Sequence, residues 1–194
     1  MIIIPSAKRQ NQQAKKIYTP DSKLILPDDI DINLNNTLIS ADKYRAYELY
    51  DGTIMREFKN LVKDDKFIKT AIKEVKFISP QFGIIDFDQP IKPYRLAYQD
   101  KVNNKTVISI WKNFYTNFPF DNSLILDLST NQTAPFFKDH NVIRIELTKF
   151  GMKVNHGKKL KAKILFHIIE NIINKREKLS KIESTFEGLL NIKY

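Results

Sequence analysis

The sequence predicts a single α/β domain of 194 residues, in which a mixed β-sheet is flanked by helices. Three short apolar segments, at 1–4, 124–128 and 142–147, have the composition of buried or half-buried strands. Two longer segments, at 64–77 and 158–176, repeat apolar residues at helical spacing. The length suffices for one hydrophobic core, and no repeat or low-complexity linker marks a second domain.

The first strand is expected at Met1–Ile4, because the run is apolar and β-branched and Pro5 ends it. A polar loop follows at 6–16. Loops that leave the carboxyl ends of strands commonly hold ligands in α/β proteins, so we expect Ser6 and Lys8 near a ligand. The segment 18–40 is rich in Asp, Asn and Pro and predicts a loop with one short helix at most.

The segments 41–61 and 64–77 are expected to be helical, with Gly52 interrupting the first. Three tyrosines recur there at three-residue spacing, which is more typical of a packed face than of a base-stacking platform. They are Tyr44, Tyr47 and Tyr50. The second helix is expected to run through Phe77 and Ile78.

The second half of the chain predicts further strands. They are Thr106–Ile110, a central strand at Leu124–Leu128, and a half-buried strand at Val142–Leu147 that pairs with Gly151–Val154. A polar loop after the central strand could reach a ligand. Its residues are Ser129, Thr130 and Asn131.

Two prolines, Pro90 and Pro93, stiffen the backbone around Lys92 and lead into Tyr94 and Arg95. A planar guanidinium beside an aromatic ring on a stiff backbone suits an anion held in one pose. The alternative is that Arg95 pairs with a carboxylate while Tyr94 closes the core.

Positive charge belongs to the two ends of the chain. The net charge is +10, of which residues 1–20 contribute +4 and residues 151–194 contribute +6, while 21–150 is neutral. If the fold brings the ends together, they form one basic cleft suited to a polyanion. Otherwise they are two independent solvated patches.

The segment 158–176 is the strongest predicted helix, with a broad apolar arc and a narrow polar side. Its expected first turn is rich in lysine, although the helix dipole favours anions there. Lysines beside free N–H groups suit a bound phosphate; the alternatives are a preceding loop or a solubilising surface. The lysines are Lys158, Lys159, Lys161 and Lys163.

Several chemistries have no motif in the sequence. The absence of cysteine excludes disulfides, thiolate nucleophiles and cysteine-ligated zinc, and it fits a reducing compartment. The three histidines lack metal-ligand spacing, and neither glycine-rich phosphate motifs nor a serine nucleophile motif is present. We therefore expect no catalytic residue, metal or cofactor, and with no signal peptide or membrane span we expect a cytoplasmic protein.

Several segments resemble the bacterial peroxide stress protein YaaA family. SPQFG at 79–83 followed by KPYRL at 92–96 is similar to the family's "LSGLYG…PYRLEMG". IPSAK at 4–8 resembles "ISPAK", ELYDG at 48–52 resembles "DVYxG", and LDLS at 126–129 resembles "INLAS". GKKLKA at 157–162, ending in IIEN at 168–171, resembles "AKKARG…IIEN", and Trp111 stands where the family has "FW".

The resemblance implies a shortened family member, one domain over 1–194, that binds DNA and limits oxidative damage in a family associated with lowering free iron. Binding without substrate turnover would be its mechanism. One alternative is an enzyme that acts on a nucleotide or another phosphorylated small molecule through the same cleft. Another is a protein that binds a protein partner through its basic tail.

Overall fold

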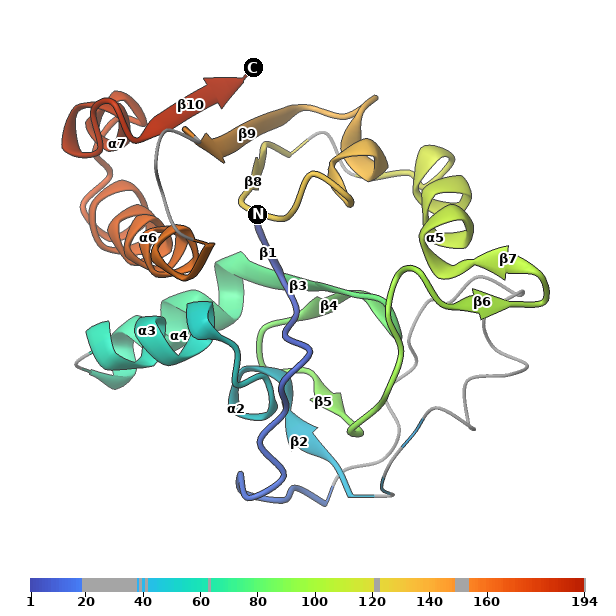
Figure 1. Cartoon of the computed structure of the whole chain (residues 1–194). Coiled ribbons are helices and arrows are strands. Elements are labelled where there is room, and N and C mark those ends of the chain that lie inside the picture. Colours follow the sequence, from blue (N-terminus) through green and yellow to red (C-terminus); the bar gives the residue numbers. More distant parts are fainter. Residues whose placement is uncertain are drawn as a thin grey trace.

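The computed structural model describes residues 1–18, 38, 40, 42–62, 64–120, 123–148 and 154–193. A six-stranded sheet forms its centre (Figure 1). Its strands are β1 (Ile2–Pro5), β3 (Val75–Ser79), β4 (Gly83–Asp86), β8 (Ile125–Asp127), β9 (Val142–Leu147) and β10 (Leu190–Lys193). Their order is β10-β9-β8-β1-β3-β4. The four inner strands are parallel and both edge strands are antiparallel, so the predicted mixed α/β sheet is confirmed.

Helices cover both faces of the sheet. Successive residues of a strand point to opposite faces, so β1 contributes to two separate apolar clusters. Ile2 and Ile4 of β1 belong to one apolar cluster and Ile3 belongs to the other. The first cluster includes residues of α2 (Ala46–Leu49), α3 (Thr53–Leu61), α4 (Asp65–Glu74), α6 (Val154–His167), the π-helical η3 (Ile168–Asn174) and α7 (Ser180–Thr185). The second includes residues of α5 (Val107–Thr116) and the 3-10 helix η2 (Ala134–Phe137).

Two small sheets complete the described elements. β2 (Tyr44–Arg45) pairs with β5 (Pro90–Ile91), and β6 (Lys101–Val102) pairs with β7 (Lys105–Thr106). In the described part of the chain, no helix has the length and apolar character that crossing a membrane requires.

The expected helix over 64–77 is wrong in its last three residues. Asp64 caps α4 by accepting a hydrogen bond from the Phe67 N–H at 2.7 Å, as a helix start requires, but α4 ends at Glu74. Phe77 and Ile78 instead lie in β3, where both are buried, on opposite faces of the sheet. A short apolar run that is buried on both sides has no periodicity that separates strand from helix.

The strand expected at Thr106–Ile110 is also wrong, because α5 begins at Val107. The Thr106 side chain caps this helix and accepts a hydrogen bond from the Ser109 N–H. Val107, Ile110 and Trp111 then form one buried helical face, so tertiary packing overrides the β-branched composition.

Other expectations are met in part. The segment expected as one helix over 41–61 contains β2, α2 and α3, and Tyr44 and Tyr50 are buried as packing residues. The antiparallel partner of β9 is β10. Of the expected partner Gly151–Val154, residues 151–153 lie outside the described residues and Val154 begins α6. Most of 18–40 likewise lies outside the described residues.

Candidate functional site

The candidate site lies at the carboxyl ends of the neighbouring parallel strands β1 and β8. The chain leaves β1 towards helices that pack on one face, whereas it leaves β8 towards η2 on the opposite face. Two adjacent strands whose connections diverge in this way open a crevice, which is the usual ligand position in α/β sheets.

A pocket of about 490 Å³ occupies this position, and we call it the sheet-edge pocket. Its volume lies within the roughly 300–1,000 Å³ of small-molecule sites. The apolar and aromatic lining residues are Pro5, Ala7, Ile78, Pro80, Tyr94, Leu96, Ala97 and Tyr98. The polar and charged ones are Ser6, Lys8, Gln10, Arg95, Gln99, Asp100, Thr130, Gln132 and Thr133. Segments far apart in the sequence therefore enclose one space.

Lys8 and Arg95 bring positive charge to the sheet-edge pocket. Both side chains are exposed, and neither forms an ion pair or hydrogen bond with another described residue. Arg95 therefore does not pair with a carboxylate of the described chain, which was the alternative considered for it. Asp100 also lines the pocket, where its Oδ2 accepts a hydrogen bond from the Ala97 N–H at 2.7 Å.

Tyr94 lies beneath Arg95 in the core and is only 5% exposed. Its hydroxyl lies 2.9 Å from Ser79 Oγ and 3.0 Å from the Tyr50 hydroxyl, forming a buried hydroxyl network. Burial raises the pKa of Tyr94, so the phenol stays protonated at neutral pH. This residue shapes the pocket wall and anchors the backbone that carries Arg95.

Tyr98 differs from Tyr94 in one respect. Its hydroxyl oxygen is buried but has no hydrogen-bond partner among the described residues. Burial raises the pKa of this phenol well above its ordinary value. A buried hydroxyl without a partner is uncommon, and this one belongs to a residue that lines the pocket.

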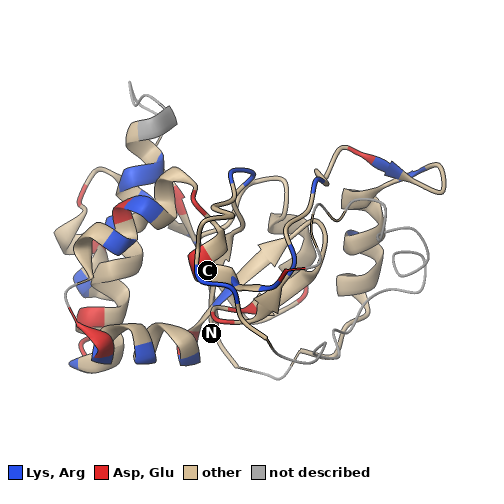
Figure 2. Cartoon of the chain, turned by 90° about the horizontal axis from the view of Figure 1, so that it is seen from below, with Lys and Arg blue, Asp and Glu red and all other residues tan. Residues whose placement is uncertain are grey.

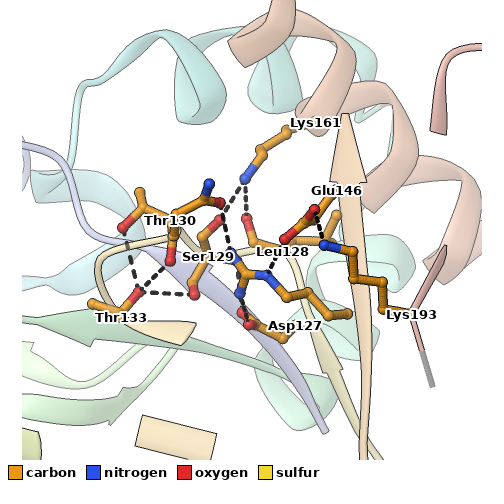
Figure 3. Close-up of polar contacts among 10 residues, drawn as sticks. Asp127, Leu128, Ser129, Thr130, Thr133, Glu146, Lys161 and Lys193 are labelled. Atoms are coloured by element: carbon orange, nitrogen blue, oxygen red, sulfur yellow. Dashed lines mark hydrogen bonds and ion pairs between the residues drawn. The ribbon is translucent and has the colours of Figure 1, made fainter. Parts of the chain in front are cut away.

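The loop after β8 is held from behind by α6, as Figure 3 shows. Lys161 Nζ donates to the carbonyl oxygen of Leu128 at 2.7 Å and to that of Ser129. Burial, and secondly the nearby Arg144, lower the pKa of Lys161 to about 8. Lys161 therefore supports the loop from which Thr130 reaches the sheet-edge pocket.

Ser129 and Asn131 have structural partners in this loop. Ser129 is buried, and its Oγ accepts a hydrogen bond from Thr133 Oγ1 at 2.9 Å. Asn131 Oδ1 accepts from Arg144 Nη2 at 3.0 Å. Arg144 also pairs with the buried Asp127, the last residue of β8. Of the loop residues expected near a ligand, Thr130 alone lines the sheet-edge pocket.

The α6 lysines do not line the sheet-edge pocket. Because α6 begins at Val154, Lys158 is already past the first helical turn, and the expected placement of these lysines around free N–H groups is wrong. Lys158 and Lys163 are exposed without a partner among the described residues. Lys159 Nζ lies 3.8 Å from a carboxylate oxygen of Glu57.

Acidic residues neutralise part of the basic charge at the chain ends. Figure 2 shows red residues among the blue ones on the helices. In the first twenty residues, Arg9 pairs with Asp51 and Lys16 pairs with Asp42. Near the C-terminus, Lys175 pairs with Glu170, and Lys193 pairs with Glu146.

The structure thus brings together Ser6, Lys8, Tyr94, Arg95 and Thr130. Lys92 is half-buried and lies outside the pocket lining. Sequence reasoning missed the stretch 97–100 and the residues at 132–133. For Tyr98 and Asp100, the available signal was their position directly after the arginine in the same segment.

Comparisons with known proteins concern the sequence of the chain and identify its family. A sequence model described as "Peroxide stress protein YaaA" matches residues 7–189. A UPF0246 protein of Streptococcus equi subsp. equi is 29% identical over 155 residues, which cover 73% of this chain and 63% of that relative. A UPF0246 protein of Streptococcus gordonii is 27% identical over 161 residues, covering 77% of this chain and 64% of the relative. The chain thus matches less than two thirds of these relatives' length, and it belongs to the peroxide stress protein YaaA family.

Proposed function

We propose that this protein acts in the response to peroxide by binding DNA in the cytoplasm and limiting the damage that peroxide and iron cause there. The contribution of the protein would be binding, without turnover of a substrate. Membership of the peroxide stress family supports the stress role. The placement of unpaired cations supports DNA as the partner.

The observation that carries DNA binding is the placement of unpaired cations at the sheet-edge pocket and on α6. Other exposed lysines of the described chain, Lys112 among them, also lack an acidic partner but do not line this pocket or belong to α6. Lys8 and Arg95 stand at the sheet-edge pocket, and Lys158 and Lys163 stand on the exposed side of α6. Elsewhere in the described chain, acids of the neutral middle segment neutralise several basic residues of the ends. Cations that stay unpaired are available to phosphates and release counterions when they bind them.

The test is the affinity for a fluorescently labelled duplex at several salt concentrations. We expect log K to fall linearly with log salt, with a slope of about −0.9 for each neutralised phosphate. Changing Lys158 and Lys163 together to Gln should reduce that slope by about 1 per lost contact. Lys112→Gln on α5 is the matched control, since Lys112 is exposed on a helix of the opposite face.

An affinity for the duplex that does not depend on salt would refute the proposed duplex surface. So would a reduction of the slope in Lys112→Gln as large as that in the double variant of Lys158 and Lys163. The stress role is tested separately by survival in hydrogen peroxide. A strain that lacks the protein should regain resistance with the wild type and regain less with the double variant.

A second candidate function is the binding or conversion of a nucleotide or another phosphorylated small molecule. The concave shape of the sheet-edge pocket, with Lys8 and Arg95 in its lining, favours this function, because a duplex can only lie across such an opening. Nucleotide titration into the wild type and Arg95→Gln tests binding, and chromatography of the incubated nucleotide tests turnover. An unchanged affinity in Arg95→Gln would exclude this site.

A further inference from the structure

We propose that the sheet-edge pocket receives one nucleotide unit, with the base beside Tyr98 and the phosphate between Lys8 and Arg95. This inference deepens the proposed function and rests on it, because it names what enters the pocket and how it is oriented. The unit has two possible sources, a free mononucleotide or an unpaired nucleotide of a DNA strand, and both present the same chemistry to the pocket.

The two ends of the ligand follow from the distribution of charge and apolar surface. Lys8 and Arg95 are exposed, so a phosphate that they bind stays near solvent. Pro5, Leu96 and Tyr98 are half-buried and form an apolar wall of the same pocket. A phosphate alone leaves this wall uncovered, whereas an aromatic base covers apolar surface and packs against tyrosine.

The hydroxyl of Tyr98 supplies the polar contact that a base requires. It is buried, stays protonated at neutral pH, and has no partner among the described residues. A phenol can donate one hydrogen bond, and every base carries acceptor atoms on its edges. In the proposed complex the edge of the base is the partner of this oxygen, because Tyr98 lines the pocket.

Asp100 favours a nucleotide with one phosphate over a ligand that carries several phosphates. Its carboxylate lines the same pocket and already accepts one hydrogen bond from the Ala97 N–H. A carboxylate repels phosphate but accepts hydrogen bonds from an amino group or a sugar hydroxyl. Two cations and one carboxylate around an apolar wall match a ligand with one phosphate, a ring and several donors.

The first experiment compares dAMP, deoxyribose 5-phosphate and inorganic phosphate by calorimetric titration. We expect dAMP to bind at least about tenfold more tightly than the sugar phosphate, because only dAMP covers the apolar wall. Tyr98→Phe should lower the dAMP affinity about three- to tenfold and leave the sugar phosphate unaffected. Arg95→Gln should weaken both ligands.

Tyr47→Phe is the control for loss of a tyrosine hydroxyl, since the Tyr47 hydroxyl donates to Glu48 Oε1 at 3.0 Å and Tyr47 does not line the pocket. It should bind dAMP like the wild type. Equal affinity for dAMP and the sugar phosphate overturns the proposal, as does wild-type affinity in Tyr98→Phe.

The second experiment separates the two sources. Displacement of a labelled single-stranded oligonucleotide by dAMP supports an unpaired nucleotide of DNA as the occupant, whereas dAMP binding without displacement supports a free mononucleotide. DNA binding without any affinity for dAMP overturns this inference and leaves the DNA proposal standing. Binding of dAMP without affinity for duplex or single strands overturns the DNA proposal alone.

Discussion

Removing the hydroxyl from each of two neighbouring buried tyrosines should change stability in different ways. In Tyr94→Phe, Tyr50 loses the hydroxyl that lies 3.0 Å away, and Ser79 Oγ loses the one at 2.9 Å. Ser79 Oγ still accepts hydrogen bonds from the N–H groups of Gln81 and Phe82, whereas the buried Tyr50 hydroxyl loses the partner at 3.0 Å. We expect the loss of these buried contacts to cost about 1–3 kcal/mol. In Tyr98→Phe no hydrogen bond to a described residue is lost, so we expect a change between zero and a gain of about 1 kcal/mol.

The pair can be measured by thermal or urea unfolding followed through Trp111. This residue is the sole tryptophan, is fully buried, and donates from Nε1 to the Pro80 carbonyl at 2.8 Å. For a chain of this size, 1 kcal/mol corresponds to about 2–4 °C in Tm. A Tyr98→Phe variant that is as unstable as Tyr94→Phe would refute the assignment of Tyr98 as an unpartnered hydroxyl.

Three further predictions concern the structure around the pocket. Arg144→Ala should cost about 3–5 kcal/mol in urea unfolding, because Asp127 is 1% exposed and loses its ion-pair partner. Loss of the exposed Lys193 should cost less than about 1 kcal/mol, and equal losses in the two variants would contradict this prediction. Burial lowers the pKa of Lys161 from 10.5 to about 8, so the unfolded state binds more protons than the folded state between these two pH values. The unfolding free energy of the wild type should therefore rise relative to that of Lys161→Met from about pH 8 to about pH 9.5, and a difference that does not change with pH would contradict this prediction. Gly83→Ala should cost more than about 2 kcal/mol, because its φ is +67° and a Cβ atom would lie 2.5 Å from a buried indole ring; a wild-type Tm would show that the ring yields freely.

Strands whose two faces differ, or whose ends carry a strong signal, were predictable from the sequence. β1 follows from three consecutive isoleucines and a proline, and β9 follows from alternating Ile143, Arg144 and Ile145. α6 follows from its apolar arc, although its start was placed four residues too late. The sheet-edge position of Ser6 and Lys8 also follows, because loops after parallel strands converge at one edge.

Elements whose identity depends on their neighbours were not predictable in this way. β3 joins a helix without a break and is buried on both faces, so local periodicity extends α4 into it. α5 carries a β-branched sequence that becomes helical because Thr106 caps it and Trp111 packs into the second cluster. Both differences arise from packing, which local propensity does not contain.

The sequence by itself determined the family, the mixed α/β class and the presence of Lys8, Tyr94 and Arg95 in a candidate site. Tertiary structure decided which charged residues remain unpaired. Arg9 and Lys159 lie close enough to acidic residues to pair with them. Lys8 and Arg95 have no such partner among the described residues. It also placed Tyr98 in the pocket lining with its hydroxyl unpartnered in the described chain. The physical reason is that pairing and burial depend on distances between segments far apart in the chain, and those distances exist only once the sheet has brought the segments together.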